Sequence, residues 1–451
     1  MKKYITKSLL ALSICAGLYS CDVQEYSDLN NPEVDAFEDN LTRGDLQDLV
    51  GGVLYSSRVG LGTYFDDCGV IGREYYRFSS SDPRFTSDLL GGENAVLDNN
   101  TFYITTPWAA RYRTVKNANL ILGFIEAQDL SAIFTAEELS ATTGFLKTMI
   151  AHELLLNLNL VDEGGIRVDV ADETNLGPFV SKSEALTFIR ATLVDAAADL
   201  SAGGEEFPFL LSSGFDSFSV PTDFASVSNA LAARVAAYQG DFPGVLSLLD
   251  DSFLTLDNNN LDLGVYHNFT QNQTDILNPM FFAVNSSTAG ARIAQPSFIT
   301  DAEADDARLS KVVLRSAVDE NGNPIANPLT LDGLTGEYDV FRYTSNVDDI
   351  PIIRKEELLL LYAEANITVN PAEAIVALDL IRQSAGLDPY SGTTDPTELT
   401  DEMLTQRRYS LFAEGHRWID VRRYNRLDEL PIDRANDDVF SLFPVPLTEN
   451  Q

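Results

Sequence analysis

Hydrophobic residues recur at helical spacing along most of the chain, and the predicted helices come in pairs. Residues 354–365 and 371–385 form the clearest pair. Asn370 occupies the expected N-cap of the second helix, Glu373 follows three residues later as in a capping box, and Gly386 predicts the end. Two helices joined by so short a connection are expected to pack as an antiparallel hairpin.

A second pair is predicted over residues 224–238 and 242–249. Ala230, Ala233 and Ala237 recur where the two helices would touch, and small residues there allow close packing. Paired helices of this kind resemble tetratricopeptide units, although the spacing between pairs is too irregular for a simple solenoid.

Four further helices and several loop-rich stretches complete the predicted fold. The helices are expected at residues 107–127, 136–160, 182–200 and 400–424. The loop-rich stretches, which contain strand-like fragments, are residues 63–103, 205–221, 251–298 and 312–343. An Asn-Gly within residues 319–323 predicts a hairpin turn. The sequence therefore predicts a mostly α protein, a tetratricopeptide-like scaffold of helical pairs with long irregular loops and a few short strands.

The N-terminus has the pattern of a secretory signal. Three lysines within the first seven residues precede an uncharged apolar run, residues 8–19, and Cys21 follows directly. A cysteine at this junction predicts a lipoprotein signal that is cut before Cys21, so that the thiol carries lipid. The alternative is an ordinary cleaved signal that happens to precede a cysteine.

These observations divide the chain into three expected parts. Residues 1–20 are the signal peptide, and residues 21–44 are the lipid anchor followed by an acidic, flexible tether. Residues 45–451 are the body, with an N-terminal part to about residue 220 and a C-terminal part from about residue 221. No second apolar stretch approaches the length of a membrane span, so the lipid is the expected membrane attachment.

Composition narrows the possible partners. The net charge is −37, which excludes nucleic acid as a partner and argues weakly against anionic ligands, because local patches can oppose the net field. After processing, Cys68 is the one cysteine left besides the lipid site, so no disulfide framework is expected. His152, His267 and His416 lie far apart in the sequence, and we therefore expect no metal site and no cofactor.

No catalytic motif is present: the chain has no nucleophile elbow, phosphate loop, HExxH or paired CxxC. The segment 407–424 is rich in functional groups, and a Glu–His–Asp site is one interpretation of it. Glu414 with Arg417, and Asp420 with Arg423, would also be neighbours three residues apart on a helix, and such ion pairs are common. We favour this structural interpretation and expect a binding protein without enzymatic activity.

Aromatic, acidic and arginine side chains are concentrated between residues 64 and 78, in a stretch predicted as loop. Aromatic rings can stack on the apolar face of a sugar while charged groups hydrogen-bond its hydroxyls. The alternative is that these rings anchor a long loop onto the scaffold, and both interpretations stay open. Trp108 and a residue of a later loop, Tyr266, are candidates of the same kind. The predicted ligand-binding residues are Tyr64, Asp66, Arg73, Tyr75, Tyr76, Arg77, Trp108 and Tyr266.

Several segments resemble signatures of the SusD/RagB family of nutrient-uptake lipoproteins. Ile-Pro-Ile-Ile-Arg at 350–354, Tyr-Ala-Glu-Ala at 362–365 and the helix end at 378–386 resemble one family motif. The charged stretch 407–424 resembles a late family helix, and Phe-Pro-Val-Pro at 443–446 resembles the closing segment. The lipoprotein signal also fits this family, and the resemblance covers nearly all of the mature chain.

The resemblance implies an outer-membrane lipoprotein at the cell surface that captures oligosaccharides and delivers them to a SusC-like TonB-dependent transporter. The closest alternative is the same role for peptides, and a surface glycoside hydrolase is less well supported. Gln406 and Ser410 replace two glutamates that are usual in the late helix. Ligand residues are not carried over, because the substrate loops vary within the family.

Overall fold

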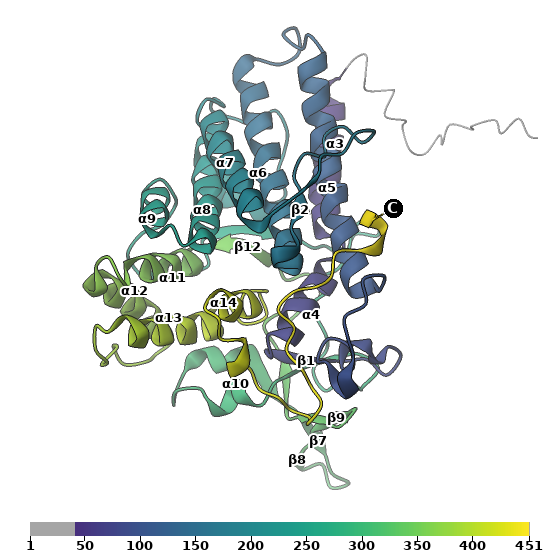
Figure 1. Ribbon diagram of the computed structural model, residues 1–451, viewed down its shortest axis with the longest axis vertical. Coiled ribbons are helices and arrows are strands. Elements are labelled where there is room, and N and C mark those ends of the chain that lie inside the picture. Colours follow the sequence, from purple (N-terminus) through teal and green to yellow (C-terminus); the bar gives the residue numbers. More distant parts are fainter. Residues whose placement is uncertain (1–40, 451) are drawn as a thin grey trace, which may run out of the picture. The chain divides into compact units, whose positions relative to one another are not determined.

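Helices build most of the protein, as the hydrophobic periodicity predicts, and the computed structural model describes residues 41–450 (Figure 1). The predicted signal peptide, Cys21 and almost all of the predicted tether lie outside the described residues. Thr42–Gln451 form one unit. Its first helix, α3 (Arg43–Arg58), starts with a capping box in which Thr42 and Asp45 each accept a hydrogen bond from the other's backbone N–H.

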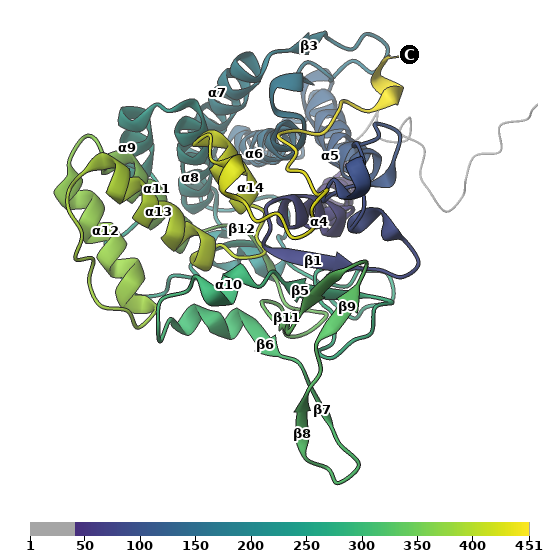
Figure 2. The same ribbon diagram turned by 60° about the horizontal axis from the view of Figure 1, so that its bottom comes forward.

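Successive antiparallel helices form the scaffold: α5 (Phe102–Ala127), α6 (Ala136–Val161), α7 (Lys182–Ser201), α8 (Pro221–Gln239) and α9 (Phe242–Asp250). They lie side by side in chain order in both views (Figures 1 and 2). Small residues allow this close packing: Ala230 and Ala233 are fully buried, as expected. A Cβ atom at Gly144 would come within 2.6 Å of the Leu200 side chain, so a larger residue would push α6 from α7.

The clearest predicted hairpin is α11 (Lys355–Asn366) and α12 (Pro371–Ser384), which pack through Ala363, Ala374 and Leu378. Gly386 ends the hairpin with a positive φ of 78°, as predicted. The expected capping box is wrong, because the Asn370 side chain makes no capping hydrogen bond. The Glu373 carboxylate instead accepts a hydrogen bond from the Tyr362 hydroxyl at 3.2 Å.

The single helix predicted over residues 400–424 is two helices, α13 (Pro396–Ser410) and α14 (Arg417–Arg423). Ala413 and Gly415 have positive φ angles of 60° and 79°, and this backbone conformation breaks the helix between α13 and α14. Glu414 therefore lies in a turn, and it pairs with Arg342 and Arg354 in place of Arg417. The predicted pair of Asp420 with Arg423 is confirmed, with an O–N distance of 3.0 Å.

Within residues 41–450, short antiparallel strands make five small sheets. The largest has the order β1–β5–β11–β6, with Tyr75 of β1 opposite Ala294 of β5. Its strands are β1 (Tyr75–Phe78), β5 (Ala291–Ala294), β11 (Tyr338–Val340) and β6 (Val312–Leu314). The two-stranded sheets pair β2 (Ile166–Arg167) with β3 (Phe179–Val180), β4 (Gly264–His267) with β12 (Ile350–Arg354), β7 (Ser316–Val318) with β8 (Pro324–Ala326), and β9 (Leu329–Leu331) with β10 (Leu334–Gly336).

The predicted hairpin turn joins β7 and β8, where the Asp319 N–H donates to the Asn323 carbonyl at 2.9 Å (Figure 2). Two short α-helices also occur, α4 (Leu61–Ile71) and α10 (Ser297–Thr300). The 3₁₀ turns are Pro83–Phe85, Gly92–Asn94, Asp162–Gly164, Ser213–Phe218, Ala307–Lys311, Leu427–Glu429 and Leu447–Asn450. Within the described part of the chain, no helix is both long and apolar enough to cross a membrane.

Candidate functional site

The aromatic run between residues 64 and 78 lies in the core. Tyr64 is in helix α4, and Tyr75 and Tyr76 are in strand β1. Their exposed fractions are 2%, 0% and 2%, and Phe78 is fully buried. The expectation that this stretch is an exposed loop is wrong, because α4 and β1 pack beneath α14 and β5. The rings therefore offer no open face on which a sugar could stack.

The charged residues of the same run bind other parts of the protein. Asp66 accepts two hydrogen bonds from Arg292, at 2.7 and 2.8 Å, and a third contact with Arg77 measures 3.4 Å. The Arg73 guanidinium donates to the main-chain carbonyls of Pro431 at 3.1 Å and Asp438 at 2.6 Å. These side chains fasten distant segments to α4 and β1, which matches the anchoring interpretation.

The two remaining candidates lie beside cavities. Tyr266, on β4, donates its hydroxyl hydrogen to the main-chain carbonyl of Asp262, and Asp262 lines a polar cavity. Trp108, on α5, lines a different cavity of about 600 Å³, within the usual range for small-molecule sites. The structure thus separates Trp108 from the six candidates between residues 64 and 78.

One face of α5 forms the main wall of the Trp108 cavity. Residues at helical spacing lie along this face: Trp108, Ala109, Tyr112, Arg113, Lys116 and Asn117. The segment after β2 contributes Val170 and Leu176 to the opposite side, and Leu176 is 48% exposed. The C-terminal 3₁₀ turn adds Thr448 and Glu449, which closes one end of the cavity.

Trp108 and Tyr112 are held by contacts with β2, β3 and the C-terminus. The indole N–H of Trp108 donates to Glu449 at 2.9 Å, and its ring stacks on Phe179 with centroids 6.4 Å apart. The Tyr112 ring meets the indole edge-on at 5.1 Å, and its hydroxyl donates to the Arg167 carbonyl at 2.9 Å. Burial raises the pKa of Tyr112, so the phenol stays neutral. Both rings are therefore preorganised.

Polar side chains on the rim are accessible. Lys116 and Glu173 form an ion pair of 2.7 Å across the opening, and both side chains are about half exposed. Arg113 is exposed and has no hydrogen-bond or ion-pair partner among residues 41–450. The amide of Asn117 makes one long contact of 3.4 Å, to the Ser56 hydroxyl. Arg113 is thus free to bind a ligand, and the Asn117 amide keeps one N–H that this contact does not use.

The cavity combines the half-buried Tyr112 ring and aliphatic side chains with hydrogen-bond donors at the rim, whereas the Trp108 side chain is only 3% exposed. This arrangement can hold a neutral polar molecule that has an apolar face, with its hydroxyl groups bound by arginine and amide groups. The sequence prediction named Trp108 but missed the rim residues Arg113, Lys116 and Asn117. Their spacing relative to Trp108 on a predicted helix was a signal that could have identified them.

The three histidines are close together, in contrast to the expectation from their sequence spacing. His152, His267 and His416 all line one internal cavity of about 30 Å³, roughly the space of a single water molecule. Burial lowers the pKa of His416 to about 4 and that of His152 to about 3, so both are neutral at pH 7. No cluster suited to a metal ion occurs among the described residues.

Comparisons with known proteins agree with the helical-pair fold. Residues 338–445 match the sequence model of the SusD family. A SusD-like protein of Formosa agariphila is 36% identical over 115 residues, which is 23% of this chain and 23% of that relative. The sequence match thus spans about a quarter of the relative's length.

Solved structures extend the likeness to most of the chain. A SusD homologue from Bacteroides thetaiotaomicron superposes with a TM-score of 0.67 at 15% identity, covering 93% of this chain and 97% of that one. A SusD-like protein from Bacteroides fragilis gives 0.66 at 17% identity, with 93% and 98% covered. A laminarin-binding SusD-like protein gives 0.62 at 16%, with 91% and 96% covered. Residues 338–445 thus match the SusD family in sequence, and most of the chain has the fold of SusD-like proteins.

Proposed function

We propose that this protein binds an oligosaccharide in the Trp108 cavity. The observation that carries the proposal is that the preorganised Tyr112 ring lies beside Arg113, which has no partner among the described residues, and beside the Asn117 amide. A sugar ring has an apolar face and a rim of hydroxyls, so it suits this combination. One structural neighbour is a laminarin-binding SusD-like protein, which supports a glycan as the ligand class.

The wider role that we propose is nutrient capture at the cell surface. Lipid on Cys21 would hold the protein at the outer membrane, and a SusC-like TonB-dependent transporter would receive the bound glycan. Support for this comes from the N-terminal sequence pattern and from the family. Replacing Cys21 with Ala is expected to release the protein from the membrane fraction, whereas retention of this variant after a high-salt wash would contradict lipid anchoring.

A peptide remains the alternative ligand, because the exposed Arg113 and the Lys116–Glu173 pair could also bind peptide groups. Hydrolysis is a weaker alternative: no group lining the Trp108 cavity is arranged as a nucleophile with an adjacent base. A peptide-binding protein and a hydrolase would each give a different result from a glycan-binding protein in a binding screen.

The test is a binding screen of the full chain by affinity electrophoresis and calorimetry, with laminarin, starch and mixed peptides as probes. We expect retention by at least one neutral glycan, whose chain length is the same after incubation. Arg113→Ala should weaken this binding about ten-fold, which corresponds to roughly 1.4 kcal/mol. Because Arg113 has no partner in the described structure, its replacement should leave the melting temperature unchanged.

Lys147→Ala is the matched control, since Lys147 is a surface cation on α6 whose partner, Asp199, lies 2.7 Å away and outside the cavity. It should bind the glycan as the wild type does. Binding of peptides alone would favour the alternative ligand, and shortened glycan chains would indicate an enzyme. Equal affinities of the wild type and Arg113→Ala would contradict the assignment of the site.

A further inference from the structure

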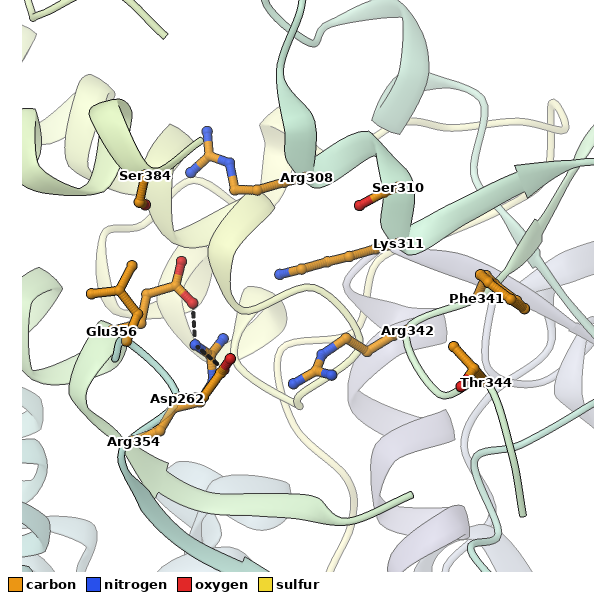
Figure 3. A pocket seen from close by; sticks show the side chains of 11 residues that line it. Asp262, Arg308, Ser310, Lys311, Phe341, Arg342, Thr344, Arg354, Glu356 and Ser384 are labelled. Carbon is orange, nitrogen blue, oxygen red and sulfur yellow. Dashed lines mark hydrogen bonds and ion pairs between the residues drawn. The ribbon is translucent and has the colours of Figure 1, made fainter. Parts of the chain in front are cut away.

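A second cavity, of about 410 Å³, gathers positive charge in a chain whose net charge is strongly negative. Four cationic side chains from separate segments line it, together with Asp262, Glu356 and several hydroxyl groups. The cations are Arg308, Lys311, Arg342 and Arg354. Figure 3 shows Lys311, Arg342 and Glu356 directed toward the same central space.

Two of the four cations are fully engaged with the protein. Arg354 donates to Glu414 at 3.1 and 3.2 Å, to the Ser410 carbonyl at 2.8 Å, and also to Glu356. Arg308 binds both carboxylate oxygens of Asp306, at 2.8 and 2.9 Å. These arginines form the wall of the cavity and have little capacity for a ligand.

The other two cations keep free donors. Lys311 donates to the main-chain carbonyls of Tyr409, at 2.8 Å, and Ser410, and no carboxylate of the described residues lies within 4.0 Å of its amine. Arg342 uses only its Nε on a carboxylate, Glu414, at 2.9 Å. Both of its terminal nitrogens lack a protein partner within residues 41–450 and project into the cavity (Figure 3).

The charges around the cavity do not balance. The four cations are matched by three buried carboxylates, those of Asp306, Glu356 and Glu414. Asp262 lies 3.7 Å from Arg354, but its side chain is 81% exposed, so water screens its charge. A partly buried cation without a partner is unfavourable, and a single negative charge brought by a ligand would relieve this cost.

We propose that this cavity binds the carboxylate of a sugar acid between Lys311 and Arg342. A singly charged group fits the imbalance of one positive charge, whereas a doubly charged phosphate would exceed it and leave the cavity with a net negative charge. The arginine fork is suited to a carboxylate. The hydroxyls of Ser310 and Ser384, which also line the cavity, offer partners for ring hydroxyls. This site is separate from the Trp108 cavity and does not depend on the function proposed there.

Protonation of Lys311 should make the affinity of this cavity for an anion depend on pH. Burial lowers the pKa of Lys311 to about 8, while Glu356 and Glu414 oppose the shift and Arg354 and Arg342 add to it. An anionic ligand stabilises the protonated amine. Affinity should therefore be constant between pH 6 and pH 7 and should fall as the pH rises above about 8, where the free site loses its proton.

The experiment is calorimetric titration of the full chain with D-glucuronate, D-glucose and sodium sulfate. We expect glucuronate to bind at least ten-fold more tightly than glucose, and equimolar sulfate to leave glucuronate binding nearly unchanged. Lys311→Met and Arg342→Gln should each reduce the affinity for glucuronate at least ten-fold. Lys147→Met, which removes a surface charge on α6, is the control and should bind normally.

Equal binding of glucose and glucuronate, or normal binding by both variants, would overturn the proposal. Complete displacement of glucuronate by sulfate would show a site for any anion, and would overturn the assignment of a sugar acid. If Lys311→Met fails to fold, the proposal is tested by the affinity of Arg342→Gln and by the pH dependence of glucuronate binding to the wild type. An unchanged affinity from pH 7 to 9.5 would contradict the role of Lys311. Arg113→Ala should leave glucuronate binding intact, so failure at one cavity is distinguishable from failure at the other.

Discussion

Two regions of this protein combine aromatic rings with arginines and acids, and they place them in opposite environments. In α4 and β1, the Tyr75 ring is fully buried and the Asp66 carboxylate is satisfied by Arg292. In the Trp108 cavity, the Tyr112 ring is half-buried and Arg113 is exposed without a partner among the described residues.

The difference is one of partners and not of composition. A charged group that is buried with a protein partner stabilises the fold only as part of its pair, whereas an exposed group without a partner is free to bind a ligand. Substitutions in α4 and β1 should therefore change stability, and substitutions in the Trp108 cavity should change binding.

Asp66→Ala should destabilise the protein most, because it leaves the Arg292 guanidinium buried without its carboxylate. We expect a loss of about 3–5 kcal/mol in the free energy of unfolding, measured by urea denaturation. Asp199→Ala breaks an ion pair with Lys147 whose side chains are about 30% exposed, and it should cost less than about 1 kcal/mol. An Asp66→Ala protein of normal stability that fails to bind glycan would reverse the roles of the two regions.

Acidification should also weaken the core while it leaves the Trp108 cavity little changed. The histidine cluster stays neutral in the folded protein, with the pKa of His416 lowered by burial from 6.5 to about 4 although Glu357 opposes this. Stability from this group is complete above pH 6.5 and is lost as the pH falls from 6.5 toward 4, because only the unfolded chain takes up the proton.

The measurement is urea denaturation at pH 6.5 and pH 5, for the wild type and for His416→Gln. The variant should lose less stability over this interval than the wild type, and contributions from other titrating groups cancel in the comparison. Equal losses would show that His416 titrates normally. Glycan affinity of the folded protein should change little over the same interval, since no histidine lines the Trp108 cavity.

Tyr112→Ala should reduce glycan affinity by roughly 1–2 kcal/mol, because it removes the preorganised ring from the cavity wall. Tyr112→Phe keeps the ring and loses only the hydroxyl contacts with Arg167, so it should bind nearly as well as the wild type. Calorimetry with the best glycan of the screen provides the comparison. Equal losses in both variants would assign the effect to the hydroxyl and not to stacking.

The smallest effect is expected for Lys116→Gln at the rim. This change breaks an ion pair with Glu173 whose two side chains are about half exposed, so stability should change by less than about 0.5 kcal/mol. Affinity for a neutral glycan should change less than it does in Arg113→Ala. A larger loss of affinity in Lys116→Gln than in Arg113→Ala would assign the main polar contact with the glycan to the Lys116–Glu173 pair.

Local pattern was sufficient for the long helices and insufficient for the segment between residues 61 and 78. The helices α5 to α8 repeat their apolar positions over many turns, so their ends were predicted well, and α6 and α7 also start at the predicted residues. The start of α5 was wrong, because the helix begins at Phe102 and Pro107 lies inside it. By contrast, α4 and β1 are short, and Asp66 is explained by Arg292, which is 226 residues away in the sequence. Such a partner has no local signature.

The candidate site shows the same limit. Trp108 was predicted from its type and position, and the polar residues around it share its helix face. Arg167 and Glu449 come from distant segments and orient Tyr112 and Trp108, which no spacing in the sequence indicates. The break in the helix at residues 411–416 was partly visible at Gly415, but the positive φ of Ala413 was not.

The most direct measurement is a crystal structure of the protein with the neutral glycan that binds best in the screen. We expect density for a sugar ring against Tyr112, with hydroxyls within hydrogen-bond distance of Arg113 or Asn117. A glycan bound elsewhere, with the Trp108 cavity empty, would contradict the central claim that this cavity is the oligosaccharide site.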